Sequence, residues 1–196
     1  VDGARAYSMC NVTDTGEEWH FQIKKVPGGA ATTGLFDSVN VGDTINLDGP
    51  FGMAYLREDA PRDILLIAGG SGLSPMISIA RAAAVSEGLK DRQIHFLFGG
   101  RTPRDICGEP ILKEELPCFG ERLHYYSAIS MPEDSASAGW TGETGFVNDL
   151  VTAKFGDDLS GFECYFAGPP AMATAVMKTL IKGKVPAAQM HFDQFY

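Results

Sequence analysis

The sequence Asp63-Ile-Leu-Leu-Ile-Ala-Gly-Gly-Ser-Gly-Leu-Ser-Pro-Met-Ile-Ser-Ile-Ala-Arg-Ala-Ala83 decides the fold class of this chain. Its apolar run at residues 64–68 predicts a strand buried on both faces, and the pattern from Pro75 onward predicts a helix. Between them, Gly69, Gly70 and Gly72 allow tight backbone angles and the close approach of a ligand. The first N–H groups of a helix favour a phosphate. The stretch therefore indicates either nucleotide binding or ordinary α/β packing.

The pattern of expected strands, helices and turns differs between the two sides of this stretch, which indicates two domains. Residues 1–58 hold short strand-like segments at 5–10, 19–25 and 44–47, separated by turns, and one short helix at 33–38. Short strands separated by turns are typical of antiparallel β structure. In residues 64–196, strands at 64–68, 93–98, 123–127 and 163–167 alternate with helices at 75–86, 110–116, 147–154 and 171–182. This alternation predicts a mainly parallel sheet covered by helices. The charged segment 57–63 connects the domains, and we expect 130–144 to be a surface loop.

The composition is that of a folded, acidic protein. With 44% hydrophobic residues, the 196-residue chain is long enough for one large or two small cores. A formal net charge of -9 argues against nucleic acid and anionic membranes as partners, because phosphate binding needs clustered Lys and Arg. Since no apolar stretch reaches the ~20 residues of a membrane span and the first residues do not resemble a signal peptide, we expect a cytoplasmic protein.

The four cysteines, Cys10, Cys107, Cys118 and Cys164, are irregularly spaced. They match neither a zinc pattern nor the cysteine run of a plant-type iron–sulfur site. The histidines are scattered as well. We therefore expect free thiols and no metal site in this chain.

Three segments outside the glycine turn have spacings that suit a ligand. On a strand at 5–10, Arg5, Tyr7 and Met9 share one face; an Arg can hold a pyrophosphate and a Tyr can lie on a planar ring, although an ordinary surface strand has the same pattern. Gly29 and Thr32 precede or begin a short helix, which indicates a phosphate site or a helix cap.

The third segment, Gly168-Pro169-Pro170, lies between an apolar strand and a helix. Open α/β sheets bind ligands at this position, and a rigid strand-to-helix turn has the same sequence.

Essentially the whole chain resembles the ferredoxin-NADP reductase superfamily. The resemblance is carried, in chain order, by Arg5-x-Tyr7-Ser8, Gly29-x-x-Thr32, Gly49-Pro-x-Gly52, Gly69-Gly-Ser-Gly-Leu-Ser-Pro75, Gly100-Arg101, Gly168-Pro-Pro170 and the ending Asp193-x-Phe195. The segments Phe98-Gly-Gly-Arg-Thr-Pro-Arg-Asp-Ile-Cys107, Gly168-Pro-Pro-Ala-Met172 and Met190-His-Phe-Asp-Gln-Phe-Tyr196 are similar to reductase components of bacterial oxygenases, such as those of toluene monooxygenase and carbazole dioxygenase.

The resemblance implies an FAD site in the first domain. Arg5 would contact the FAD pyrophosphate, Tyr7 would pack on the isoalloxazine with Met9 beside it on the strand, and Ser8 would hydrogen-bond near N5, where hydride arrives. The set implied for the other phosphate oxygens is Gly29, Thr32 and Thr33. Asp193 would be the family's acidic residue near the flavin. Phe195, preferred over the neighbouring alternative Tyr196, would cover the flavin until nicotinamide displaces it. Ser8, Asp193 and Phe195 are thus the implied catalytic residues.

The resemblance also implies a nicotinamide-nucleotide site in the second domain. Gly70, Ser71, Gly72 and Pro75 would hold its pyrophosphate, and Arg101 with Asp105 would lie near its adenosine ribose. Gly168, Pro169 and Pro170 would guide the nicotinamide. Arg101 and Arg104 suit the 2′-phosphate of NADPH. Because similar oxygenase reductases mostly use NADH, we expect NADH, with NADPH as the alternative.

Two features depart from the family pattern. Ala167 replaces the Cys that often precedes Gly-Pro-Pro, which puts the positioning of hydride transfer in doubt. The Arg-x-Tyr-Ser strand begins at residue 5 rather than mid-barrel, so the antiparallel flavin barrel is incomplete at its N-terminal side, with exposed sheet edges. We expect a partial polypeptide, with any [2Fe-2S] domain upstream of Val1.

Three functions are consistent with these residues. The first is a monomeric FAD-dependent NADH reductase that passes single electrons through a [2Fe-2S] centre to an oxygenase component or a ferredoxin. The second is a subunit that binds FAD and nucleotide without turning over NADH, which the loss of the Cys at Ala167 favours. The third, a dehydrogenase acting directly on a small substrate, lacks a recognisable acid–base pair.

Overall fold

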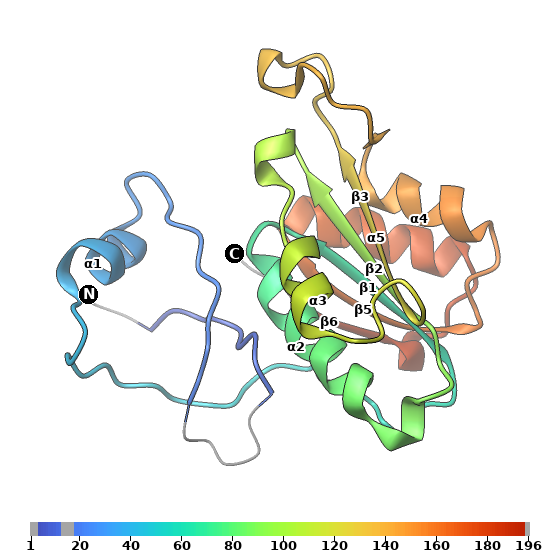
Figure 1. Ribbon diagram of the computed structural model, residues 1–196, viewed down its shortest axis with the longest axis horizontal. Coiled ribbons are helices and arrows are strands. Elements are labelled where there is room, and N and C mark those ends of the chain that lie inside the picture. The colour runs from blue at the N-terminus through green and yellow to red at the C-terminus, as the bar shows by residue number, and fades with distance from the viewer. Residues whose placement is uncertain (1–3, 13–17, 195–196) are drawn as a thin grey trace.

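The computed structural model describes residues 4–12 and 18–194, which form two lobes (Figure 1). The larger lobe is a six-stranded sheet in the order β4-β3-β2-β1-β5-β6, with every neighbouring pair parallel. The strands are β1 (Asp63–Gly69), β2 (Ile94–Gly100), β3 (Leu123–Ile129), β4 (Glu143–Thr144), β5 (Phe162–Gly168) and β6 (Met190–Gln194). The predicted parallel sheet is therefore confirmed.

Four helices cover the two faces of this sheet (Figure 1). They are α2 (Leu73–Val85), α3 (Glu109–Glu115), α4 (Val147–Phe155) and α5 (Pro170–Lys182). Short 3₁₀ turns lie at Gly70–Gly72, Glu87–Leu89, Pro103–Asp105, Ser135–Ser137 and Ala187–Gln189. The predicted strands and helices of this domain all form, with bounds that differ by a few residues. The sequence prediction missed β4 and β6, which are short.

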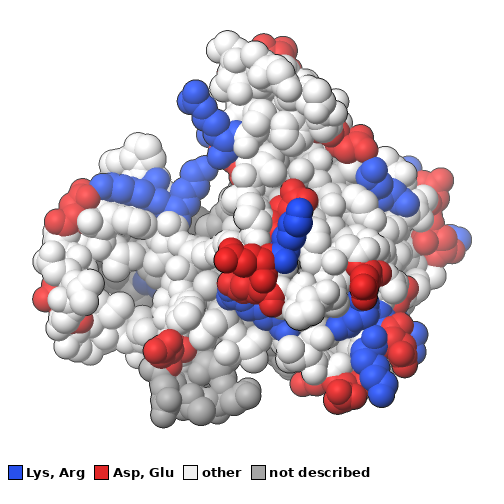
Figure 2. All heavy atoms as spheres, in the orientation of Figure 1, with Lys and Arg blue, Asp and Glu red and all other residues white. Residues whose placement is uncertain are grey.

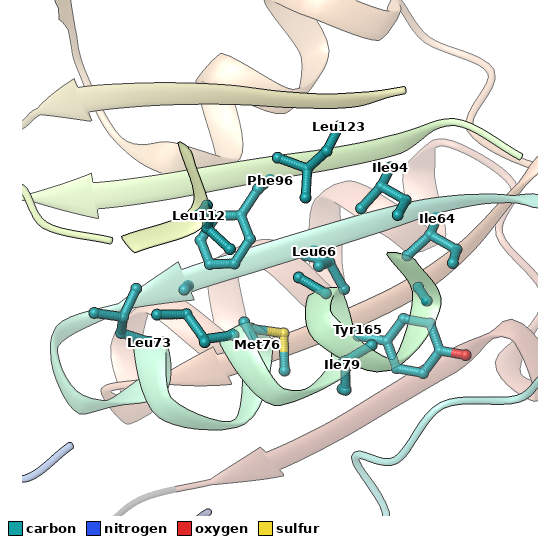
Figure 3. Packing of buried hydrophobic residues seen from close by; sticks show 14 of the residues in the cluster. Ile64, Leu66, Leu73, Met76, Ile79, Ile94, Phe96, Leu112, Leu123 and Tyr165 are labelled. Atoms are coloured by element: carbon teal, nitrogen blue, oxygen red, sulfur yellow. The ribbon is translucent and has the colours of Figure 1, made fainter. Parts of the chain in front are cut away.

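The core explains why β1 is apolar at every interior position. Ile64 and Leu66 face α2 and α3, while Leu65 and Ile67 face α4 and α5, because successive side chains of a strand point to opposite faces. Figure 3 shows Ile64 and Leu66 in one buried cluster with Met76 of α2. A side chain of this size contributes about 1.5–3 kcal/mol when fully buried, so two-sided burial holds β1 at the centre of the sheet.

The smaller lobe contains α1 (Ala30–Ser38), where a short helix was expected, but the predicted strands are not formed among its described residues. The antiparallel structure described in this lobe is one bridge between Met9 and Phe21, supported by a 2.8 Å hydrogen bond from the Cys10 N–H to the His20 carbonyl. Residues 44–47 are irregular. The expected antiparallel barrel is thus not observed among the described residues, where the Ser8 carbonyl and the Gln22 N–H beside the bridge bond to the Ser74 hydroxyl of α2.

Within the described part of the chain, no helix is long and apolar enough to cross a membrane. The same residues hold no group of three or more His, Cys, Asp or Glu side chains suited to a metal ion. Cys10, Cys107, Cys118 and Cys164 are free thiols, as expected.

Candidate nucleotide-binding site

Two turns meet at the carboxyl ends of β1 and β5. The turn Gly70–Gly72 follows β1, and Gly168 with Pro169 and Pro170 follows β5. The two strands are parallel neighbours. The chain order reverses between them, because β2 and β3 lie on one side of β1, whereas β5 and β6 lie on the other side. Ligands of open α/β sheets bind outside the carboxyl ends of the strands at such a switch point. The structure thus brings the two glycine segments singled out in the sequence to one place.

The turns differ in which residues pack and which stay open. Gly72 is buried against β5: a Cβ atom there would lie 1.9 Å from the Ala167 carbonyl oxygen. Gly70 has a φ of +56° and open space where a side chain would be, and Ser71 beside it is exposed. An L-residue disfavours this backbone conformation, whereas glycine tolerates it. Gly70 and Ser71 therefore offer an uncovered backbone at the start of α2, which fits a phosphate group, while Gly72 sets the contact between the turns.

On the other turn, Gly168 is buried, whereas Pro169 and Pro170 are exposed. Pro170 is the first residue of α5, where a missing N–H costs nothing. Pro75, within the first turn of α2, is buried. Pro169 and Pro170 are thus accessible to a ligand, and Pro75 acts in packing.

Arg101 and Asp105 lie in the turn that follows β2. The Asp105 carboxylate accepts N–H hydrogen bonds from Thr102 at 3.2 Å and Arg101 at 3.3 Å, and its other oxygen is 3.3 Å from the Lys24 ammonium. Burial alone would raise the pKa of Asp105, but the Thr102 hydrogen bond and Lys24 outweigh it and lower that pKa. Asp105 therefore fixes its own turn and joins the two lobes.

The Arg101 side chain is 74% exposed, and Arg104 is exposed as well. Figure 2 shows Lys and Arg side chains near the junction of the two lobes. The turn after β2 thus offers positive charge to a ligand, while its one carboxylate is already paired.

The residues expected at the flavin are spread over the smaller lobe. The exposed Arg5 guanidinium donates to the Ala4 carbonyl at 2.9 Å, and Tyr7 is 38% exposed. Ser8 and Met9 are half-buried where this segment meets the larger lobe, and the Ser8 carbonyl accepts a 2.6 Å hydrogen bond from the Ser74 hydroxyl. The structure thus brings the backbone of Ser8, alone of this group, into hydrogen-bond contact with α2.

Gly29, Thr32 and Thr33 lie together at the start of α1, which is on the far side of the smaller lobe from the sheet (Figure 1). The buried Thr32 hydroxyl accepts a 3.1 Å hydrogen bond from the Val26 N–H. A side chain at Gly29 would meet Thr32 and Val26 at 3.0 Å. The Thr32 hydroxyl therefore holds the turn, and Thr33 is exposed.

Asp193 lies on β6 beside Ala167, its register partner on β5. Its Oδ1 accepts a 3.0 Å hydrogen bond from the Met53 N–H, and Gly52, at φ +99°, passes so close that a Cβ atom would be 2.8 Å from Oδ2. Asp193 thus anchors the loop that contains Gly49-Pro-Phe-Gly52. Phe195 and Tyr196 lie outside the described residues.

Sequence reasoning missed the role of Ser74 on α2. This side chain is 2% exposed and contacts two segments of the smaller lobe. Lys24, which pairs with Asp105, was missed too. The available signal was a row of polar residues, Ser74, Ser78 and Arg81, on an otherwise apolar helix.

Two family models cover most of the chain. Residues 66–178 match the oxidoreductase NAD-binding domain, and residues 1–55 match the oxidoreductase FAD-binding domain. The chain belongs to the oxidoreductase NAD-binding domain family. Both cofactor-binding domain families that the resemblance implied are therefore matched in this chain.

Similar proteins are reductase components of oxygenase systems. The ferredoxin–NAD(P)(+) reductase CarAd of Metapseudomonas resinovorans is 35% identical over 98% of this chain and 55% of its own length. The reductase component DmpP of phenol 2-monooxygenase from a Pseudomonas species is 32% identical over the whole chain and 54% of its own. The ferredoxin reductase in carbazole 1,9a-dioxygenase superimposes with a TM-score of 0.84 at 34% identity, over 97% of this chain and 55% of that one. The chain spans about half the length of these relatives.

Proposed function

We propose that this chain is the FAD- and NADH-binding part of a reductase that supplies electrons to an oxygenase component or a ferredoxin. Its two domain families and the names of its relatives support this activity. When bound, the flavin accepts a hydride from NADH and releases electrons singly, in the full-length protein through a [2Fe-2S] centre. The proposal takes residues 1–58 as part of an antiparallel flavin barrel and the protein as a cytoplasmic monomer.

One observation carries this function: the structure joins the proposed nucleotide turn and the proposed flavin segment through the start of α2. Gly70 and Ser71 precede α2, and Ser74 in its first turn bonds to the Ser8 carbonyl. A pyrophosphate at the turn and a flavin beside Ser8 would thus be held by adjacent groups. Holding donor and acceptor in one geometry contributes much of the rate of such a reaction.

The residues of this chain would form two binding sites, one for the nicotinamide nucleotide and one for the flavin. We assign the nicotinamide-nucleotide pyrophosphate to the open backbone at Gly70 and Ser71, with Gly72 and Pro75 shaping the turn. Gly168, Pro169 and Pro170 would direct the nicotinamide from the neighbouring strand end. The flavin contacts implied for Arg5, Tyr7, Ser8, Met9, Gly29, Thr32 and Thr33, and the cover implied for Phe195 or Tyr196, belong to this proposal as well. Asp193 would act from β6, where it fixes the adjacent loop.

The choice between NADH and NADPH rests on the turn after β2. The Asp105 carboxylate is bonded to backbone N–H groups and to Lys24, and Arg101 and Arg104 are exposed. We propose NADH as the donor, as the resemblance to oxygenase reductases implies. The test is kcat/KM for both dinucleotides in the wild type and in Arg104→Ala; a strong wild-type preference for NADPH would overturn the choice.

Anaerobic mixing of the full-length, FAD-loaded protein with NADH tests the activity itself. We expect loss of flavin absorbance and its return when the oxygenase or ferredoxin partner is added. A protein that cannot be loaded with FAD would refute the proposal. A protein that binds FAD and shows no reduction at saturating NADH would instead be a binding subunit. Analytical ultracentrifugation of the same sample tests the monomer.

A further inference from the structure

One face of α2 bonds to the backbone of the smaller lobe through three polar side chains, which we call the α2 polar stripe. Their spacing in the helix places them one above another. Each donates to a backbone carbonyl within residues 8–11. The pairs are Ser74 Oγ to Ser8 at 2.6 Å, Ser78 Oγ to Asn11 at 3.0 Å, and Arg81 Nη1 to Cys10.

The Ser74 hydroxyl bonds to both backbone groups of one residue pair in the antiparallel pairing of the smaller lobe. The Cys10 N–H donates to the His20 carbonyl, and hydrogen-bonded pairs of an antiparallel ladder recur every second residue. The next such pair joins Ser8 and Gln22, whose N–H and C=O groups would bond to each other. The Ser74 hydroxyl bonds to both of these groups: it donates to the Ser8 carbonyl at 2.6 Å and accepts from the Gln22 N–H at 3.3 Å. One side chain of α2 is thus inserted between two backbone segments of the other lobe.

Ser74 lies next to the turn that would hold the dinucleotide, so its hydrogen bonds bear on the proposed reaction. The residue follows the turn Gly70–Gly72 in the first turn of α2, and it is almost fully buried. Its hydroxyl therefore ties the helix end that would hold the dinucleotide to the segment that contains Ser8. By contrast, Ser78 lies one helical turn further from the glycine turn, and its hydroxyl donates to the Asn11 carbonyl.

We propose that Ser74 is a positioning residue for hydride transfer, which sets the distance between the nicotinamide nucleotide and the flavin by joining α2 to Ser8 and Gln22. The inference rests on the proposed function. Removing the hydroxyl takes away both bonds to α2 and exposes the Gln22 N–H to water, so the two lobes shift relative to one another. A misplacement of about 1 Å between reacting groups can cost about 100-fold in rate.

The test compares Ser74→Ala, Ser74→Thr and the control Ser78→Ala in the full-length, FAD-loaded protein. We expect Ser74→Ala to slow flavin reduction at saturating NADH by roughly tenfold or more, with the KM for NADH little changed because Gly70 and Ser71 are intact. Ser74→Thr, which keeps the hydroxyl, should restore the rate. Ser78→Ala should stay within about twofold of the wild type. An unchanged rate in Ser74→Ala, or equal slowing in Ser78→Ala, would overturn the inference.

A second readout does not depend on bound cofactor. In FAD-free protein, amide hydrogen exchange at Gln22 should be several-fold faster in Ser74→Ala than in the wild type, and unchanged in Ser78→Ala; equal exchange in all three overturns the inference. If Ser74→Ala does not load FAD, Ser74→Cys, which has nearly the same volume and a weak donor, replaces it in both measurements. A wild type that loads FAD and is not reduced by NADH refutes the proposed function itself, whatever the variants do.

Discussion

Replacing Gly72 with alanine is expected to push apart the two turns of the nucleotide-binding site. A Cβ atom at this position would lie 1.9 Å from the Ala167 carbonyl oxygen and 2.7 Å from the Gly168 nitrogen. Since ordinary contacts begin at 3.4 Å, the backbones of the two turns have to separate by about 1.5 Å. Backbone atoms of a central strand cannot rotate away as a flexible side chain can.

The cost follows from this overlap. Overpacking a core typically costs 1–3 kcal/mol, and a backbone obstacle on β5 places Gly72→Ala at the upper end, at about 3 kcal/mol. With a urea m-value of about 2 kcal/mol per molar, the unfolding midpoint would fall by about 1.5 M. The KM for NADH should rise, because the turn that would hold its pyrophosphate moves away from Pro169 and Pro170.

Urea unfolding followed by tryptophan fluorescence measures the effect. Gly161→Ala is the matched control, because a Cβ atom there meets nothing within 4 Å, so its unfolding free energy should stay within about 0.5 kcal/mol of the wild type. If Gly72→Ala unfolds at the same urea concentration as Gly161→Ala, the close packing of the two turns described here is refuted.

Three further predictions address other parts of the fold. Glu163→Ala should lower the unfolding free energy in urea by about 3 kcal/mol, because the buried Glu163 carboxylate lies 2.6 Å from His191; a loss below 1 kcal/mol would contradict this role. Asp193→Ala should speed limited proteolysis near Met53, whose N–H loses its acceptor, while Asp193→Asn keeps an acceptor and should resist cleavage as the wild type does. Burial and the nearby His124 lower the pKa of His95, so the unfolded state binds a proton there first and stability should fall as the pH drops below about 6.5. Unfolding midpoints between pH 5.5 and 7.5 should depend less on pH in His95→Leu, and equal slopes would count against the prediction.

Local patterns were sufficient to predict four of the six strands of the larger lobe and the four helices that cover its sheet. The apolar run in β1 and the glycines after it constrain the backbone over a few residues, and the helical spacing of α2 continues directly from them. The motif at Gly168 was placed correctly at the end of a strand for the same reason. Which strands are neighbours was left open, and the adjacency of β1 and β5 is what brings Gly70 and Gly168 to one site.

The predictions that failed concern backbone groups whose partners are distant in sequence. Residues 5–10 and 19–25 have a strand pattern, yet their pairing is limited to the bridge at Met9 and Phe21 in the described residues. Alternating side chains show that a segment can form a strand, but not which groups will bond to it. The use of Asp105 as a turn-fixing carboxylate paired with Lys24 was equally hidden, since Lys24 lies 81 residues away.

The sequence by itself determined that a buried strand, a glycine turn and a helix follow one another at residues 63–85, because these elements depend on nearby side chains and on glycine backbone freedom. Only the tertiary structure decided how that helix meets the rest of the chain. The Ser74 hydroxyl bonds to the Ser8 carbonyl across 66 residues of sequence. Such a contact depends on the position of a whole domain, which no local pattern encodes.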